Sequence, residues 1–219
     1  MIDLNNSKQK RWLITGASGR VGRMLGRYWQ QEPPNAVVVL QTRTTNIDGA
    51  RDDNREIFWD PLTNPLPLEA GKIDCIIAYA GITPTHGTDM EQNAALAEAT
   101  LVSAFQAGIG RVLLTPSSAI YGAPTSHAAL REDDFPSPVN DYGRSKLAME
   151  AICNRWRKCG LEVCCLRIGN VAGADALLMN GLAARDQLLN IDRSGPVALW
   201  CRSFDRVMCS KGDELWDKP

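Results

Sequence analysis

Tyr142 and Lys146 are the two residues whose types and spacing best suit a chemical step. They lie four residues apart in a segment of helical character, so both side chains would share one face of a helix. A tyrosine with an ordinary pKa of about 10 is a poor base at neutral pH, and a nearby ammonium favours the phenolate. The pair predicts a proton-transferring phenol, which a hydride transfer between an alcohol and a carbonyl requires. The alternative is an exposed pair on an amphipathic helix.

A hydroxyl that could assist this phenol follows the fifth predicted strand. The stretch from Thr115 to Gly122 contains two adjacent serines, Ser117 and Ser118. Ligands bind at the carboxyl ends of strands in an open parallel sheet. A hydroxyl at that edge would hydrogen-bond a substrate oxygen and stabilise charge that develops on it.

A glycine-rich turn follows the first predicted strand and opens an amphipathic helix. Gly16 permits a tight turn, Gly19 lets a pyrophosphate approach the backbone, and Gly22 allows close packing of helix on sheet. The free N–H groups of the helix then face the phosphates. The turn also contains Ser18, Arg20 and Val21. A plain turn before a helix is the alternative.

The end of the second predicted strand bears on the choice of dinucleotide. An acidic residue there accepts hydrogen bonds from a free ribose 2′-hydroxyl, whereas an arginine accommodates a 2′-phosphate. The sequence has Arg43 and no carboxylate before Asp48, which favours NADP over NAD. Arg43, aided by Arg20, would contact the phosphate, or else it is a solvated loop cation. Asp60 suits an adenine contact and an ordinary turn equally well.

Short apolar runs alternate with helical segments, which predicts an α/β fold: a doubly wound parallel sheet with helices on both faces. The predicted strands are 11–15, 37–41, 56–59, 74–79, 111–115 and 162–167, and the predicted helices are 21–31, 90–108 and 141–159. Prolines leave little room for a helix in 60–72. We expect one domain over 1–219, in which 174–219 is reduced or irregular, with a helix at 177–189, a strand at 197–201 and a frayed end.

The composition narrows the class of partner. Lys and Arg total 24 against 25 Asp and Glu, so a net charge of -1 would recruit neither nucleic acid nor an anionic membrane. A small molecule is the expected partner, and no metal site is predicted. Seven cysteines without a C-x-x-C pair indicate a reduced protein. No signal peptide and no run of about 18 apolar residues is present, so a cytoplasmic location is expected.

Five motifs in order give a resemblance to a known family. They are the turn Thr15 to Gly22, Ala80-Gly81, the stretch Ser117 to Gly122, Tyr142-Gly143-x-x-Lys146 and the stretch Leu166 to Gly173. Together they resemble the extended short-chain dehydrogenase/reductases, the NAD-dependent epimerase/dehydratase group, over about residues 11–173. The resemblance implies a Rossmann-type fold.

The resemblance also implies roles for individual residues. Tyr142 would be the catalytic acid/base, and Lys146 would bind the nicotinamide ribose and tune the phenol. Ser117 would polarise the substrate, with Ser118 as the substitute. The three glycines would line the pyrophosphate, and Ala80 and Gly81 would pass under the cofactor. Asn93 matches an asparagine whose role is structural or catalytic, and Asn170 belongs to the loop that approaches the substrate.

Three departures qualify the resemblance. Ser118-Ala119 replaces the Asp-Glu that sugar-nucleotide dehydratases carry, so elimination of water is not expected. Ala172 replaces a tyrosine, and the chain stops at Pro219, where family members continue into a substrate lobe. Either the substrate lobe would be reduced in this chain, or the chain would be a shortened member of the family.

The leading hypothesis is an NADP-dependent oxidoreductase, with NAD as the alternative cofactor, that acts on a small hydroxyl or carbonyl substrate. A sugar epimerase and a dinucleotide-binding sensor without turnover are the other two interpretations. A homodimer through the two long helices would be common among relatives of this kind.

Overall fold

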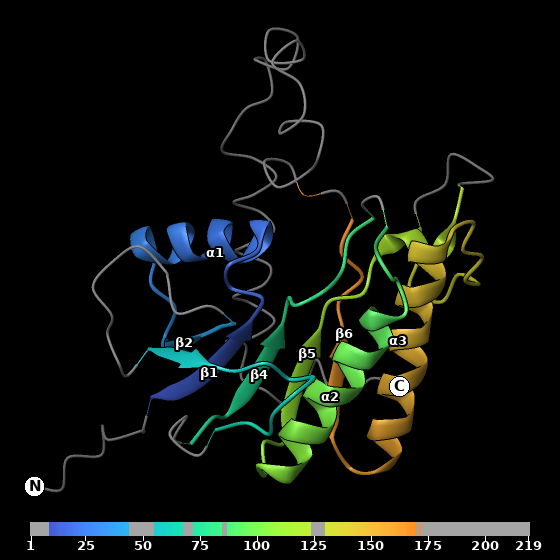
Figure 1. Ribbon diagram of the computed structural model, residues 1–219. Helices are drawn as coiled ribbons and strands as arrows, with labels where there is room; N and C mark the ends of the chain where they lie inside the picture. The colour runs from blue at the N-terminus through green and yellow to red at the C-terminus, as the bar shows by residue number, and fades with distance from the viewer. Residues whose placement is uncertain are drawn as a thin grey trace, which may run out of the picture.

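The computed structural model describes residues 9–43, 55–67, 72–84, 87–123, 130–169 and 171. Within these ranges, parallel strands form one sheet in the order β3-β2-β1-β4-β5-β6 (Figure 1). The strands are β1 (Lys10–Thr15), β2 (Ala36–Thr42), β3 (Glu56–Phe58), β4 (Cys75–Ala78), β5 (Arg111–Leu114) and β6 (Glu162–Cys165).

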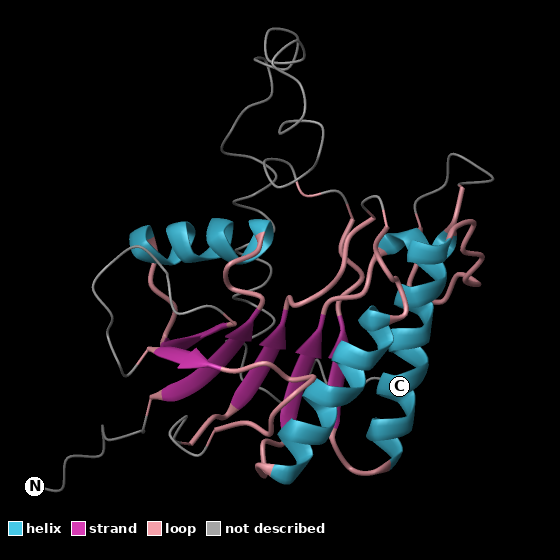
Figure 2. Cartoon of the chain, viewed as in Figure 1, coloured by secondary structure: helices cyan, strands magenta, loops and turns pink. Residues whose placement is uncertain are grey.

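Helices cover both faces of this sheet, as the sequence predicts (Figure 2). Helix α1 (Arg20–Gln31) lies on one face, and α2 (Gln92–Gln106) and α3 (Asp141–Lys158) lie side by side on the other. A short 3₁₀ turn, η2 (Ser118–Tyr121), follows β5 and contacts α3. The order of the elements is therefore that of a doubly wound fold.

The sheet has an apolar core on each of its two faces, and the buried side chains of the central strands form part of both cores. Every residue of β4 is buried, because a central parallel strand is covered on both faces. Its alternate side chains divide between the layers: Cys75 and Ile77 pack with Leu25 and Trp29 of α1, whereas Ile76 and Ala78 join the cluster under α2 and α3. The sheet is thereby fixed as a rigid platform between two apolar layers.

The chain reverses its direction of sheet growth between β1 and β4. Ile14 of β1 pairs with Leu40 of β2 on one side and with Ile77 of β4 on the other. From β1 the first half of the chain adds strands toward β3, and the second half adds them toward β6. Open α/β sheets bind ligands outside the carboxyl ends of the strands at such a point.

All six predicted strands and all three predicted helices within the described ranges are confirmed, with ends that move by at most two residues. The predicted helix 90–108 ends early because Gly108 adopts a φ of +68°, a common helix stop. The described part of 60–72 contains no helix, as its prolines predict. The expectations for 174–219 lie outside the described residues. None of the described helices is long and apolar enough to cross a membrane.

Candidate functional site

The glycine turn closes against the segment that follows β4. Gly16 has a φ of +69°, and a Cβ there would lie 2.5 Å from the backbone nitrogen of Ala80. The Gly19 nitrogen donates to the Gly16 oxygen at 2.9 Å. A Cβ on Gly22 would come within 2.6 Å of the Ala17 backbone, so this glycine sets the approach of α1 to the sheet. Positions 16 and 22 exclude a side chain for steric reasons, and a Cβ on Gly19 would lie 3.0 Å from the Gly16 oxygen, a tight contact.

The amino end of α1 is open to an anion. Its N-cap is Gly19, which provides no side-chain cap, and the first turn contains no acidic residue. The positive end of the helix dipole and its unpaired N–H groups are thus free of a competing carboxylate. Ser18 and Arg20 are exposed beside it, and Val21 is half-buried. A pyrophosphate fits these donors.

A cavity of about 140 Å³ lies beside this turn. It is bounded by the turn, by the ends of β2 and β4 and by the start of α2. Six residues that the sequence predicts to hold the cofactor line it: Gly16, Ser18, Gly19, Arg43, Ala80 and Gly81. The narrow backbone cradle, kept open by glycines, fits the pyrophosphate part of a dinucleotide.

Gln41 is a residue of this cavity that sequence reasoning missed. It is buried, its Oε1 accepts a hydrogen bond from the Gly16 nitrogen at 2.9 Å, and its Nε2 donates to the Trp59 oxygen. A polar residue within the apolar run of β2 was the signal that could have found it. Gln41 braces the glycine turn and places a neutral amide at the end of β2, where the sequence predicts the ribose partner.

Three further residues that the sequence predicts to contact the cofactor are Asp60, Arg20 and Arg43. The Oδ1 atom of Asp60 accepts from the Leu62 nitrogen at 3.1 Å, so this carboxylate stabilises the turn that follows β3. That geometry matches the turn alternative, and the adenine contact stays a prediction. Arg20 is exposed at the first residue of α1, and Arg43 is exposed at the rim of the cavity.

Tyr142 and Lys146 lie together in the first turns of α3. The Asn140 side chain caps this helix by accepting from the Gly143 nitrogen at 2.8 Å. The Lys146 Nζ lies 5.5 Å from the centre of the Tyr142 ring, and Lys146 is only 5% exposed. The predicted shared face is therefore confirmed, and the alternative of an exposed pair is wrong for the lysine.

Asn93 holds this lysine in place. It is fully buried in α2, and its Oδ1 accepts from the Lys146 Nζ at 3.1 Å and from the Ile82 nitrogen at 2.9 Å. Its Nδ2 donates to the Ile82 oxygen and to the Ser145 hydroxyl. A Cβ on Gly81 would lie 3.1 Å from the same Nζ. Asn93 is therefore a positioning residue that links α2, α3 and the segment after β4.

Burial of the Lys146 ammonium lowers its pKa from 10.5 to about 8. At neutral pH the ammonium still predominates, so Lys146 places a positive charge 5.5 Å from the centre of the Tyr142 ring. Between these two pKa values Lys146 is mostly protonated in the unfolded chain and mostly neutral in the folded chain. The free energy of unfolding therefore increases as pH rises through that range.

This pKa difference predicts a pH-dependent effect of Lys146→Met. Between about pH 7 and about pH 9.5, the free energy of unfolding of the natural chain should gain about 2 kcal/mol relative to the variant. Urea titrations of both proteins at several pH values measure the difference, and other titrating groups cancel between them. Parallel pH curves would show that the lysine keeps its ordinary pKa.

Ser117 is the N-cap of η2 and Ser118 is its first residue, and η2 lies directly beside the start of α3. The Ser117 Oγ accepts from the Ala119 nitrogen at 3.2 Å, and the Ser118 nitrogen donates to the Ile168 oxygen at 3.0 Å. A Cβ on Gly143 would lie 2.6 Å from the Ala119 oxygen, so this glycine lets α3 approach η2 closely. The fold therefore brings η2, with Ser118 in it and Ser117 as its N-cap, against the first turn of α3. Asn170 lies outside the described residues.

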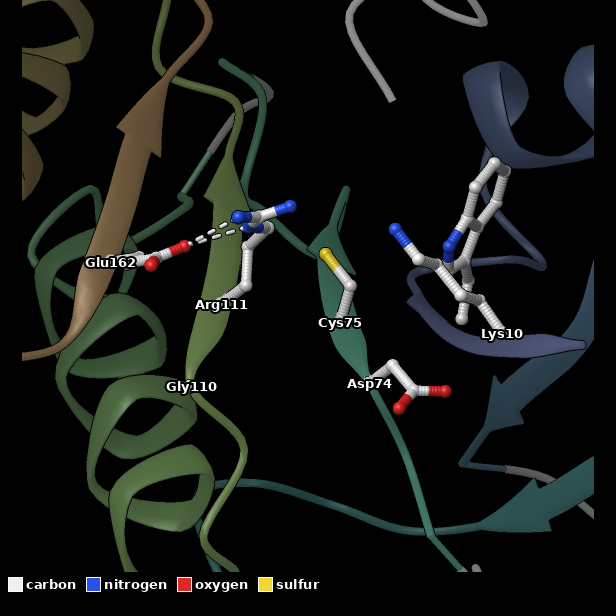
Figure 3. Close-up of a pocket in the computed structure, with 7 residues that line it drawn as sticks. Lys10, Asp74, Cys75, Gly110, Arg111 and Glu162 are labelled. Atoms are coloured by element: carbon white, nitrogen blue, oxygen red, sulfur yellow. Dashed lines mark hydrogen bonds and ion pairs between the residues drawn. The ribbon is translucent and has the colours of Figure 1, made fainter. Parts of the chain in front are cut away.

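Another cavity, of about 260 Å³, lies at the opposite ends of the strands (Figure 3). Lys10 and Arg111, which line it, begin β1 and β5. Arg111 forms an ion pair with Glu162 of the neighbouring strand β6 at one side of this cavity. Amino ends of parallel strands are not where open α/β sheets bind ligands, so the cavity beside the glycine turn is the better candidate.

The strand order, the glycine turn and the cavity at the reversal point define a Rossmann-type dinucleotide-binding fold. The profile of the NAD-dependent epimerase/dehydratase family matches residues 12–200. The chain belongs to this family.

Individual relatives agree with this placement. The chain is 43% identical over 167 residues to an uncharacterized protein, y4nG, of Sinorhizobium fredii, which covers 74% of this chain and 41% of that protein. It is 35% identical over 119 residues to the UDP-glucose 4-epimerase of Azospirillum brasilense, covering 51% of this chain and 34% of the epimerase. Among solved structures, MoeE5 in complex with UDP-glucose and NAD is similar, with a TM-score of 0.59 and 26% identity over 72% of this chain and 53% of MoeE5. The chain thus spans about half or less of the length of these relatives.

Proposed function

We propose that this chain binds a nicotinamide dinucleotide and supports redox chemistry at a substrate that carries a hydroxyl or carbonyl group. The observation that carries the proposal is the buried Lys146 ammonium, which Asn93 fixes beside the Tyr142 ring. Among the described residues Lys146 has no salt-bridge partner, and a buried ammonium without one costs stability. Its presence at the carboxyl edge of the sheet therefore favours a functional explanation.

Each residue of the site has a stated task in this proposal. The glycine turn and the amino end of α1 hold the pyrophosphate, and Gly81 leaves room for the cofactor beside Lys146. A bound nicotinamide would accept or deliver the hydride. Tyr142 takes the proton from the substrate hydroxyl, or returns it to the carbonyl, while the Lys146 ammonium places a positive charge beside the ring. Ser117 hydrogen-bonds the substrate oxygen, and Ser118 is the substitute.

NADP is the proposed cofactor, although MoeE5 is described in complex with NAD. The preference is supported by two residues at the end of β2. Gln41 presents a neutral amide, which is occupied by the Gly16 nitrogen and the Trp59 oxygen, and Arg43 lies exposed at the rim of the cavity. A guanidinium suits a 2′-phosphate, whereas the residues of β2 and Arg43, which the structure describes, include no carboxylate to accept from a free 2′-hydroxyl.

Arg43→Ala tests this preference. Loss of charge-assisted hydrogen bonds to the 2′-phosphate should weaken NADPH binding by about 10- to 100-fold and leave NADH binding unchanged. Fluorescence titration with both dinucleotides measures the two dissociation constants. Arg27→Ala, at an exposed position of α1, is the matched control and should change neither value. Equal losses for both dinucleotides would contradict the 2′-phosphate contact.

Sugar epimerisation is the second candidate function. It is favoured by the similarity to UDP-glucose 4-epimerases, of which that of Azospirillum brasilense is one. In this case the same phenol would remove and return a proton at one hydroxyl of a nucleotide-bound hexose. Net oxidation then disappears, because the cofactor is restored within each turnover.

Incubation of the chain with NADP or NAD and a panel of alcohols, aldehydes and UDP-hexoses tests the proposed function. Absorbance of the reduced nicotinamide reports net redox chemistry, and NMR of the sugar reports epimerisation. We expect one of the two signals. Dinucleotide binding without either signal would overturn the enzymatic proposal in favour of a dinucleotide-binding sensor.

A further inference from the structure

A cavity of about 470 Å³ lies between the middle of α3, the end of β6 and residues 130–132. It is separate from the cavity beside the glycine turn and shares none of its lining residues. Cys165, Arg157 and Glu150 are among the residues that line it. Ser118, the substitute hydroxyl of the proposed function, also lines this cavity, but the proposed function uses none of these three side chains, so their chemistry calls for its own explanation.

Two cysteines meet behind this cavity. Successive side chains of β6 point to opposite faces, so Cys165 packs into the core under α3, whereas Cys164 packs on the α1 side. Cys153 of α3 is fully buried in the same core as Cys165. The Cys153 and Cys165 side chains are joined by a hydrogen bond. The fold thus pairs a cavity-lining thiol with a buried one.

A cation lies beside the outer thiol. The Nη2 of Arg157 lies 3.7 Å from the Cys165 Sγ, and the Nε of Arg157 donates to the Val163 oxygen at 2.7 Å, which fixes the guanidinium. The hydrogen bond with Cys153 is the main cause of a lowered pKa at Cys165; burial opposes it and Arg157 assists it. The same hydrogen bond, together with burial, raises the pKa of Cys153. The Glu150 carboxylate also faces the thiols, but Arg167 pairs with it at 2.8 Å.

We propose that Cys165 is a peroxide-reactive thiol and that Cys153 is its resolving partner, so that oxidation joins β6 to α3 by a disulfide. The Cys165 thiolate attacks one oxygen of hydrogen peroxide, the O–O bond breaks, and the departing hydroxide takes a proton from solvent. Cys165 becomes a sulfenic acid. The Cys153 sulfur then attacks this sulfur, and the S–O bond breaks as hydroxyl leaves with the Cys153 proton. Two thiols and one peroxide give one disulfide and two waters.

This site goes beyond the proposed function and does not depend on it, because its readout is a covalent bond. Thiolate character and access decide which cysteines are oxidised. Cys159 is exposed at the C-cap of α3. It serves as an internal comparison for simple exposure.

Peptide mapping of the full chain tests the proposal. The protein is treated with hydrogen peroxide, free thiols are alkylated, and tryptic peptides are analysed by mass spectrometry without reduction. Trypsin separates residues 147–155, with Cys153, from residues 159–167, with Cys159, Cys164 and Cys165. We expect these two peptides to be linked, and reduction by dithiothreitol should release them.

Variants assign the bond within the second peptide. Cys165→Ser should abolish the linked species, whereas Cys164→Ser, the matched control from the other face of β6, should leave it unchanged. Should Cys165→Ser fail to fold, fragment ions of the natural linked peptide identify the bonded cysteine. A link that survives in Cys165→Ser, a link from Cys165 to Cys201 or Cys209, or oxidation of Cys159 while both paired thiols stay alkylated would each overturn the proposal.

Discussion

Tyr142→Phe is expected to lower turnover by about 10²- to 10⁴-fold while dinucleotide affinity stays unchanged. Loss of the phenol removes the acid/base, but the ring and its contact with the Lys146 ammonium, 5.5 Å from the ring centre, are retained. Steady-state rates with the substrate that the panel identifies give the first quantity, and fluorescence titration with the dinucleotide gives the second. The split between rate and affinity distinguishes chemistry from binding.

Tyr28→Phe is the matched control for this experiment. The Tyr28 hydroxyl lies on α1 and donates to Glu32 at 2.7 Å, away from the site on α3. Its loss should leave turnover unchanged. Equal rates in the Tyr142→Phe variant and the natural chain would remove the phenol from the mechanism, and equal losses in both tyrosine variants would point to a general effect on folding.

Arg167→Met is expected to destabilise the fold by about 3–5 kcal/mol, because it leaves a buried carboxylate unpaired. The Nε and Nη2 of Arg167 each lie 2.8 Å from an oxygen of Glu150, whose side chain is 11% exposed. The same guanidinium bonds the Glu132 oxygen at 2.7 Å and the Tyr121 hydroxyl. Urea denaturation measures the loss of free energy of unfolding.

Two further variants determine whether the pairing is responsible. Arg167→Met combined with Glu150→Met should recover much of the stability, since no isolated charge remains buried. Arg144→Met removes a surface pair with Asp141 and should cost less than about 1 kcal/mol. A double variant as unstable as Arg167→Met alone would assign the loss to the bonds with Glu132 and Tyr121 instead.

The fold and the glycine turn were predictable because each depends on local pattern. Apolar runs of strand length, helical segments and the spacing of Gly16, Gly19 and Gly22 are visible in a single sequence. Tyr142 and Lys146 were found for the same reason, as their four-residue spacing fixes a common helix face.

The interactions that complete the site were not predictable, because they join residues distant in sequence. Gln41 bonds the Gly16 nitrogen, 25 positions away, and Asn93 bonds Lys146, 53 positions away. Neither partner can be chosen until the sheet order is known. The link between Arg167 and Glu150 likewise depends on how β6 approaches α3. The resemblance identified Asn93 as a residue of interest, but only the structure shows what it holds.

The amide of Gln41 has a consequence for how a ligand enters. Its two hydrogen bonds tie the loop after β1 to the residue after β3. The edge of the cavity beside the glycine turn is therefore fixed at two points before any ligand binds. These backbone segments are already ordered in the folded protein. Ligand binding therefore costs less conformational entropy than it would if the segments had to become ordered on binding. A ligand that binds at this end of the molecule should therefore enter a preformed site, without coupled folding of the glycine loop.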